Sequence, residues 1–216
     1  GLEVDAENID LWEQYGGFAF SAALDPPQDG GVSPEAQGYY RDAIRAYEKV
    51  FEGKGSGTPV GHLRNIIAAY IQLDEVASAV DVGERVLQTH SQEDVLWSIF
   101  ADALHRNEQL DDAITALDRV REINPSHPSA NLRQGQWLIE AGRIVDAVVA
   151  LKAAAANNPA RAQQAASMLF NDAYQKGYQQ KDYPYAIVGM TAAKELPDLS
   201  EAMMGQLNFW HGFSVY

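Results

Sequence analysis

The stretches LDDAITALDRVREINP (residues 110–125) and IVDAVVALKAAAANNP (residues 144–159) decide the fold of this protein, because the second restates the first after 34 residues. Asp-Ala, Ala-Leu and Asn-Pro return at matching places, and apolar residues return with the three- and four-residue spacing of one helix face. A fixed period of this length is typical of proteins built from stacked supersecondary units. The sequence therefore predicts a repeat architecture.

Three blocks of 34 residues follow one another without a gap, and each reads as two amphipathic helices joined by a short turn. Small residues such as Ala101 and Gly135 on first helices, and Ala113 and Ala147 on second ones, allow two helix axes to approach closely. One such hairpin cannot bury its own apolar face, so neighbouring hairpins are expected to stack. The blocks occupy residues 60–93, 94–127 and 128–161.

The order of residues within a block resembles the tetratricopeptide repeat, which places a bulky residue, a large–small pair, further apolar residues, an alanine and a closing proline at fixed positions. The residues that match in the second block are Trp97, Phe100-Ala101, Leu104, Ala113, Leu117, Val120 and Pro125. The third block matches again with Gln134-Gly135, Leu138, Gly142, Ala147, Leu151, Ala154 and Pro159. The resemblance implies an all-α, right-handed α-α superhelix (a solenoid of stacked helical hairpins) of about five units.

The rest of the chain is expected to complete a single array over residues 1–216. Residues 8–59 read as a divergent repeat with a loop insertion at 25–34, and residues 162–198 as another, whose first helix runs from about 162 to 179. Residues 199–216 read as the start of a further or capping helix. Because the chain begins and stops within a unit, we expect it to be a piece of a longer protein.

Composition excludes several classes of partner. Thirty Asp and Glu against sixteen Lys and Arg give a formal charge of −14, so nucleic acid and anionic membrane surfaces are unexpected partners. No apolar run is long enough to insert in a membrane, and the chain has no cysteine. No signal peptide is visible, which leaves cytoplasmic and periplasmic locations open.

No catalytic, cofactor or metal motif stands out. The sequence GKGSG (residues 53–57) lacks the Ser or Thr that must follow the lysine of a phosphate loop, and we interpret it as a flexible linker between repeats. The five histidines lack the spacing of a metal site and are expected at the surface or in turns. Asp111 and Asp112 are adjacent, so they point apart, and acidic residues suit the start of a helix. The sequence predicts no enzyme.

The resemblance implies that the first helix of each unit lines a concave groove, where an extended or helical peptide lies. Ile99 and Leu132 would give this groove an apolar strip for hydrophobic anchors. The carboxylate clamp of chaperone-binding members is incomplete, because Arg64 and Arg133 take basic clamp positions but Ala68, Ile99 and Ser129 take the other three. The residues expected in the groove are Arg64, Asn65, Gln72, Ser98, Ile99, Asp102, Leu132, Arg133, Gln136 and Tyr178.

The expected function is a protein–protein interaction scaffold that binds a peptide or helical segment of a partner in this groove. One alternative is a regulatory or substrate-presenting module of a larger enzyme, such as a glycosyltransferase or a peptidase. Another is self-assembly, in which the uncapped C-terminal helix around Phe209, Trp210 and Phe213 stacks on a second copy as a homo-oligomer.

Overall fold

A computed structural model describes residues 8–24 and 31–215 of the chain. The described residues form eleven α-helices and no strand, and they divide into two compact units, unit 1 (Gly1–Ile123) and unit 2 (Asn124–Tyr216). The predicted all-helical fold of stacked hairpins is confirmed. Within the described ranges, no helix is both long and apolar enough to cross a bilayer.

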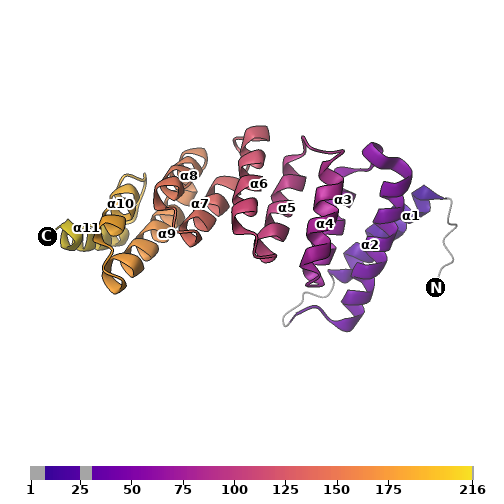
Figure 1. The fold of residues 1–216 in the computed structure, drawn as a ribbon, viewed down its shortest axis with the longest axis horizontal. Coiled ribbons are helices and arrows are strands. Elements are labelled where there is room, and N and C mark those ends of the chain that lie inside the picture. The colour runs from indigo at the N-terminus through magenta and orange to yellow at the C-terminus, as the bar shows by residue number, and fades with distance from the viewer. Residues whose placement is uncertain (1–7, 25–30, 216) are drawn as a thin grey trace. The chain divides into compact units, whose positions relative to one another are not determined.

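Unit 1 consists of three helical hairpins, which pair α1 with α2, α3 with α4, and α5 with α6 (Figure 1). The hairpins stack in chain order, because α2 packs against α3 and α5 packs against both α3 and α4. The bounds of the six helices are α1 (Ile9–Ala23), α2 (Pro34–Lys54), α3 (Val60–Gln72), α4 (Val76–Leu87), α5 (Asp94–Arg106) and α6 (Leu110–Ile123).

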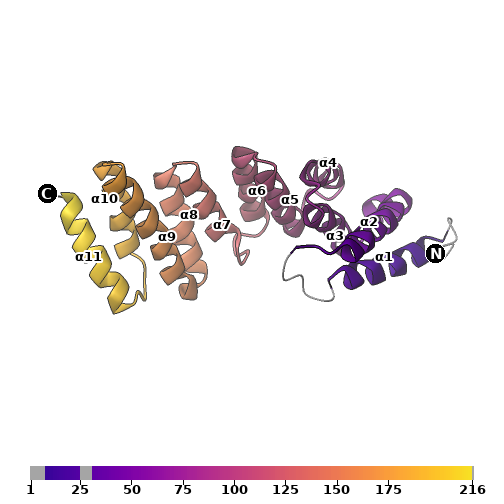
Figure 2. The same ribbon diagram turned by 90° about the horizontal axis from the view of Figure 1, so that it is seen from below.

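Unit 2 contains the hairpin of α7 and α8, a second hairpin of α9 and α10, and a final helix α11 that packs on α10 (Figure 2). The predicted long helix over residues 162–179 is found, but its last five residues form a π-helical turn, η3 (Gln175–Gln179). The bounds of the α-helices are α7 (Ala130–Glu140), α8 (Ile144–Asn157), α9 (Ala162–Tyr174), α10 (Tyr183–Lys194) and α11 (Glu201–Val215).

The same backbone turn joins the two helices of three hairpins. Its left-handed residue is Asp74 (φ 60°), Glu108 (φ 61°) or Gly142 (φ 74°), and successive ones lie 34 residues apart. In each turn the N–H of the following residue donates to the carbonyl five residues earlier, at N···O distances of 2.8–2.9 Å. This is the bond that closes a Schellman motif, so the main chain itself satisfies the helix end. The turn predicted at Ala141-Gly142 is therefore confirmed, and it recurs.

Close packing between helices depends on small residues at the crossings. A Cβ atom placed on Gly83 of α4 would lie 2.2 Å from Cδ2 of Phe100 on α5. One placed on Gly135 of α7 would lie 2.4 Å from Cγ of Leu151 on α8. Both distances are far below van der Waals contact, so only glycine lets these side chains reach the neighbouring backbone. The sequence had predicted such a close approach at Gly135.

The connection between α2 and α3 differs from the flexible linker that the sequence predicted. Gly53 belongs to the last turn of α2, where a Cβ atom would lie 2.6 Å from Cδ1 of Ile9. The helix ends at Gly55, which has φ 53°, and a 3₁₀ turn (Gly55–Gly57) leads to α3. The run of glycines therefore serves tight packing and a sharp helix end. The link between repeats is confined to Gly55–Gly57, whereas Gly53 and Lys54 belong to α2.

Candidate functional site

Three residues that the sequence placed in a groove lie on α3 in unit 1. Arg64 and Gln72 are exposed, and Asn65 is half-buried. Arg64 Nη1 lies 3.5 Å from Asn65 Oδ1, at the upper limit for a hydrogen bond. The guanidinium and both amides therefore present donors and acceptors close to solvent.

Three further predicted residues lie on α5, which packs directly against α3. Ser98, Ile99 and Asp102 are all half-buried, so their side chains reach the surface without joining the core. The structure thus brings six of the ten predicted residues onto two adjacent helices of one unit. We call them the inner-face set: Arg64, Asn65, Gln72, Ser98, Ile99 and Asp102.

Asn65 belongs to a network of polar side chains from α2 and α3. The imidazole of His62 stacks on the ring of Tyr47, with centroids 4.6 Å apart and planes 17° apart. The hydroxyl of Tyr47 is in turn hydrogen-bonded to Asn65. This hydrogen bond lowers the pKa of Tyr47, but burial has the larger effect and raises the pKa above its usual value. The network fixes the surface amide of Asn65 against α2.

The same network continues to two charged groups. Lys54 donates to the carboxylate of Glu13 and lowers the pKa of that carboxyl. Nδ1 of His62 lies 3.6 Å from Oε1 of Glu13, but burial outweighs this attraction and lowers the pKa of His62. His62 is half-buried on α3, which differs from the surface or turn position expected for the histidines, whereas His90 is buried but lies in the turn between α4 and α5, as expected. Their burial depends on long-range packing, which the spacing of histidines does not report.

The predicted groove residues on α7 of unit 2 differ in burial. Leu132 is only 6% exposed and belongs to the hydrophobic core of this unit, so it does not line an apolar strip. Gln136 is exposed, and Arg133 is half-buried with its guanidinium 5.1 Å from the ring centroid of Trp137. Tyr178 lies in the π-helical turn, and its side chain falls outside the described residues.

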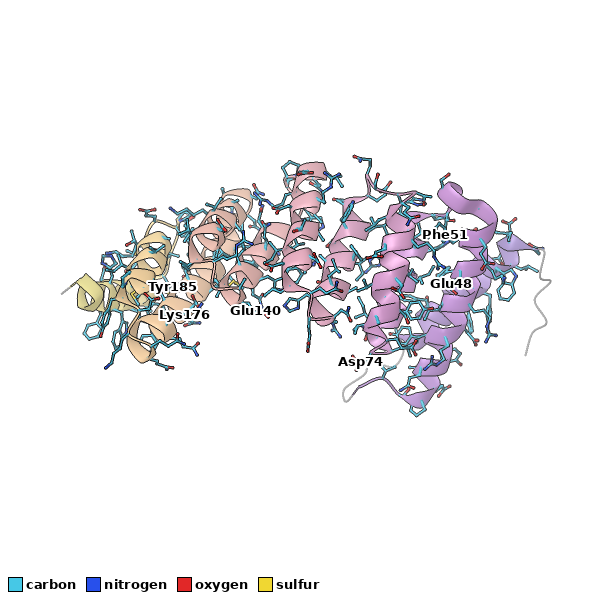
Figure 3. All side chains as sticks on the ribbon, viewed as in Figure 1. Glu48, Phe51, Asp74, Glu140, Lys176 and Tyr185 are labelled. Atoms are coloured by element: carbon cyan, nitrogen blue, oxygen red, sulfur yellow. The ribbon has the colours of Figure 1, made fainter. Side chains whose placement is uncertain are left out.

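A half-buried polar cluster that the sequence did not reveal joins three parts of unit 2. Tyr185 on α10 donates to Oδ2 of Asp172 at 2.5 Å, and Lys176 Nζ donates to the Tyr185 hydroxyl at 2.8 Å (Figure 3). Lys176 also donates to the carbonyl of Ile139 near the end of α7, at 3.3 Å. Burial and the neighbouring Asp172 carboxylate raise the pKa of Tyr185, so its phenol stays neutral. These contacts link α9, the π-helical turn, α10 and the end of α7.

Unit 1 contains a cavity of about 490 Å³ among α4, α5 and α6, which we call the α4–α6 cavity. Its apolar floor consists of Leu87, Trp97, Phe100, Leu104 and Ala116. Its polar rim consists of Glu84, Gln88, Gln109, Asp112 and Thr115.

This cavity lies away from the inner-face set. At 3.6 residues per turn, its α5 residues (Trp97, Phe100 and Leu104) point about 150° around the helix from Ser98 and Asp102. The sequence had assigned these apolar residues to packing alone. A repeat period shows which residues face a neighbouring helix, but not whether that neighbour covers them completely.

Comparison with known proteins agrees with this architecture. The family model described as tetratricopeptide repeat matches residues 104–169. A comparison with curated protein sequences gives no match. In the described parts of the chain, no group of three or more His, Cys, Asp or Glu residues is arranged to hold a metal ion.

Several solved structures share the fold. A crystal structure of MamA has a TM-score of 0.58 and 19% sequence identity, covering 74% of this chain and 91% of that one. A MamA RS-1 ArsTM double mutant has a TM-score of 0.60 and 16% identity, covering 89% and 95%. The first TPR of Spaghetti (RPAP3), bound to the HSP90 peptide SRMEEVD, has a TM-score of 0.50 and 19% identity, covering 66% and 99%. Residues 104–169 therefore match the tetratricopeptide repeat family, and the described helical hairpins share the fold of these solved structures.

Proposed function

We propose that the chain is a protein–protein interaction scaffold which binds a peptide or helical segment of a partner protein on the inner-face set of unit 1. Tetratricopeptide repeats are typically non-catalytic interaction modules, and the fold supports this general role. The observation that carries the specific site is the placement of six predicted side chains on two packed helices, with none of them buried in the core.

The chemistry of the inner-face set suits a peptide. Asn65 and Gln72 each offer a donor and an acceptor, which match the N–H and C=O groups of an extended main chain. Ile99 would contact an apolar side chain, and Arg64 would pair with a carboxylate of the ligand. A solved relative of the fold, the first TPR of Spaghetti, is bound to a peptide, which supports the class of ligand but not its sequence.

The ligand is not expected to be an acidic C-terminal tail. A site for paired carboxylates needs several converging cations and amides. Here Ala68 and Ile99 occupy clamp positions without a polar group, and Asp102 adds a negative charge to the same surface. The proposal therefore favours a peptide of mixed polarity with one apolar anchor.

The test is an affinity capture from native lysate with three forms of the chain: wild type, the Arg64→Glu, Ile99→Asp double variant, and Val149→Asp. Val149 is 60% exposed on α8 of unit 2, so its change introduces the same acid onto an unrelated surface. Circular dichroism would verify that all three are folded. A protein retained by wild type and Val149→Asp but lost by the double variant supports the site, and equal retention by all three refutes it.

Self-association is a second candidate, favoured by one observation. Phe209 on α11 is 61% exposed, whereas the neighbouring Trp210 packs edge-on against Tyr174 at 4.9 Å. An exposed ring of this size on the last helix is a surface on which a second copy of the chain could stack. Sedimentation of wild type and Phe209→Asp over a range of concentrations would decide, because a monomer at all concentrations in both forms removes this candidate.

A further inference from the structure

We propose that the α4–α6 cavity is a second protein-binding site, which accepts one bulky apolar side chain from a partner segment that carries Lys or Arg on both sides of that side chain. The inference goes beyond the proposed function, because the cavity faces away from the inner-face set and uses none of its residues. It rests on the floor, the rim and the size of the cavity.

The floor is apolar and held in place. Phe100 is 7% exposed and packs directly on Gly83, while Leu104 is 4% exposed. The Trp97 indole Nε1 donates to the carbonyl of Ser91 at 2.9 Å, and the Arg119 guanidinium lies 5.9 Å from the Trp97 ring centroid. A floor whose rings are already fixed loses little conformational entropy on binding.

The rim is acidic and able to form new contacts. Glu84 comes from α4 and Asp112 from α6, so the two carboxylates approach the cavity from different helices. Within the described residues Glu84 takes part in no ion pair, and Gln88 in no side-chain hydrogen bond. Asp112 accepts one hydrogen bond, from Nε2 of Gln109 at 3.3 Å. Carboxylates beside an apolar floor select a ligand whose apolar group is flanked by cations.

The volume of the cavity and the polar groups around it fit a short peptide segment. A volume of about 490 Å³ falls within the range of sites that bury a compact ligand. The amides of Gln88 and Gln109 can each donate to and accept from a peptide main chain next to the anchoring side chain. A chain with a formal charge of −14 also attracts a basic segment over a longer distance than direct contact.

The probe for this site is a phage-displayed library of random 12-residue peptides, selected on the immobilised full chain. Enriched peptides would be synthesised with a fluorescent label, and their affinity would be measured by fluorescence polarisation. Four forms of the chain are compared: wild type, Glu84→Gln with Asp112→Asn, Thr115→Trp, and Arg64→Glu with Ile99→Asp. Thr115 is exposed on the rim, so tryptophan there fills the cavity without removing a core residue.

The expected peptides carry an aromatic or large aliphatic residue flanked by Lys or Arg. Their affinity should fall about tenfold or more when both carboxylates are neutralised, and should be lost in Thr115→Trp. It should be unchanged in Arg64→Glu with Ile99→Asp, which separates this site from the inner-face set. The proposal is overturned if no peptide binds wild type better than Thr115→Trp. It is also overturned if the enriched peptides lack basic residues, or if only the inner-face variant weakens them.

Discussion

Replacing Gly83 by alanine gives the sharpest test of the packing described above. The substitution adds one Cβ atom to α4 at a point 2.2 Å from Cδ2 and 2.9 Å from Cε2 of Phe100. Phe100 is 7% exposed and its ring is rigid, so either the ring or the helix must shift. The perturbation is therefore the smallest one that forces apart two neighbouring hairpins of unit 1.

The expected cost follows from two opposing effects. Overpacking a well-filled core costs about 1–3 kcal/mol, and a contact this short belongs in the upper part of that range. Alanine in a helix interior recovers about 0.5–1 kcal/mol relative to glycine. Gly83→Ala should therefore lower the free energy of unfolding by about 1–2 kcal/mol.

Gly38 provides the matched control, because it is exposed within α2 and a Cβ atom there would meet nothing within 4 Å. Gly38→Ala should raise stability by about 0.5–1 kcal/mol through helix propensity alone. Urea unfolding of both variants and wild type, followed by far-UV circular dichroism, measures the two shifts. If Gly83→Ala moved the transition in the same direction as Gly38→Ala, the tight crossing of α4 and α5 would be refuted.

Three further predictions concern the core, a histidine and the polar cluster of unit 2. Leu151→Ala, at a fully buried position, should cost about 2–5 kcal/mol in urea unfolding, while Val149→Ala at a 60% exposed position should be near neutral. Burial lowers the pKa of His62 from its ordinary 6.5, so folding favours the neutral imidazole. The contribution of His62 to the free energy of unfolding is therefore fully present above pH 6.5 and is lost as the pH falls below that value. In thermal unfolding across that pH range, His62→Phe should lose less stability than wild type, and parallel curves would contradict this. Asp172→Ala leaves the half-buried Lys176 without its carboxylate and should cost about 1–2 kcal/mol, and an unchanged unfolding midpoint would show that the cluster does not brace unit 2.

The helical hairpins could be predicted from the sequence because they depend on local spacing. The apolar rhythm of each block, the turn at Gly142 and the small residue at Gly135 all express contacts between residues close in the chain, or repeated at a fixed period. Packing requirements of this kind recur in the sequence wherever they recur in the structure.

The details of the surface could not be predicted, because they depend on where neighbouring hairpins leave a side chain uncovered. Leu132 occupies a position that the repeat pattern assigns to the groove, yet it completes the core of unit 2. Trp97 and Phe100 follow the core pattern, yet they form the floor of a cavity. His62 is half-buried against Tyr47, which comes from a different hairpin. The division of the whole chain into about five repeats stays a prediction.

The recurring left-handed turn has a consequence for how such a chain can change during evolution. Because main-chain hydrogen bonds close the turn, no side chain is needed to cap it at Asp74 or Glu108, and the positive φ of these residues mainly disfavours β-branched side chains there. Both residues are exposed, so substitution there is little constrained by the core. New sequence could therefore be grafted at these points, such as an epitope or a binding loop, while the helices on either side keep their register. The repeat thus separates the residues that conserve the fold from the positions at which new specificity can arise.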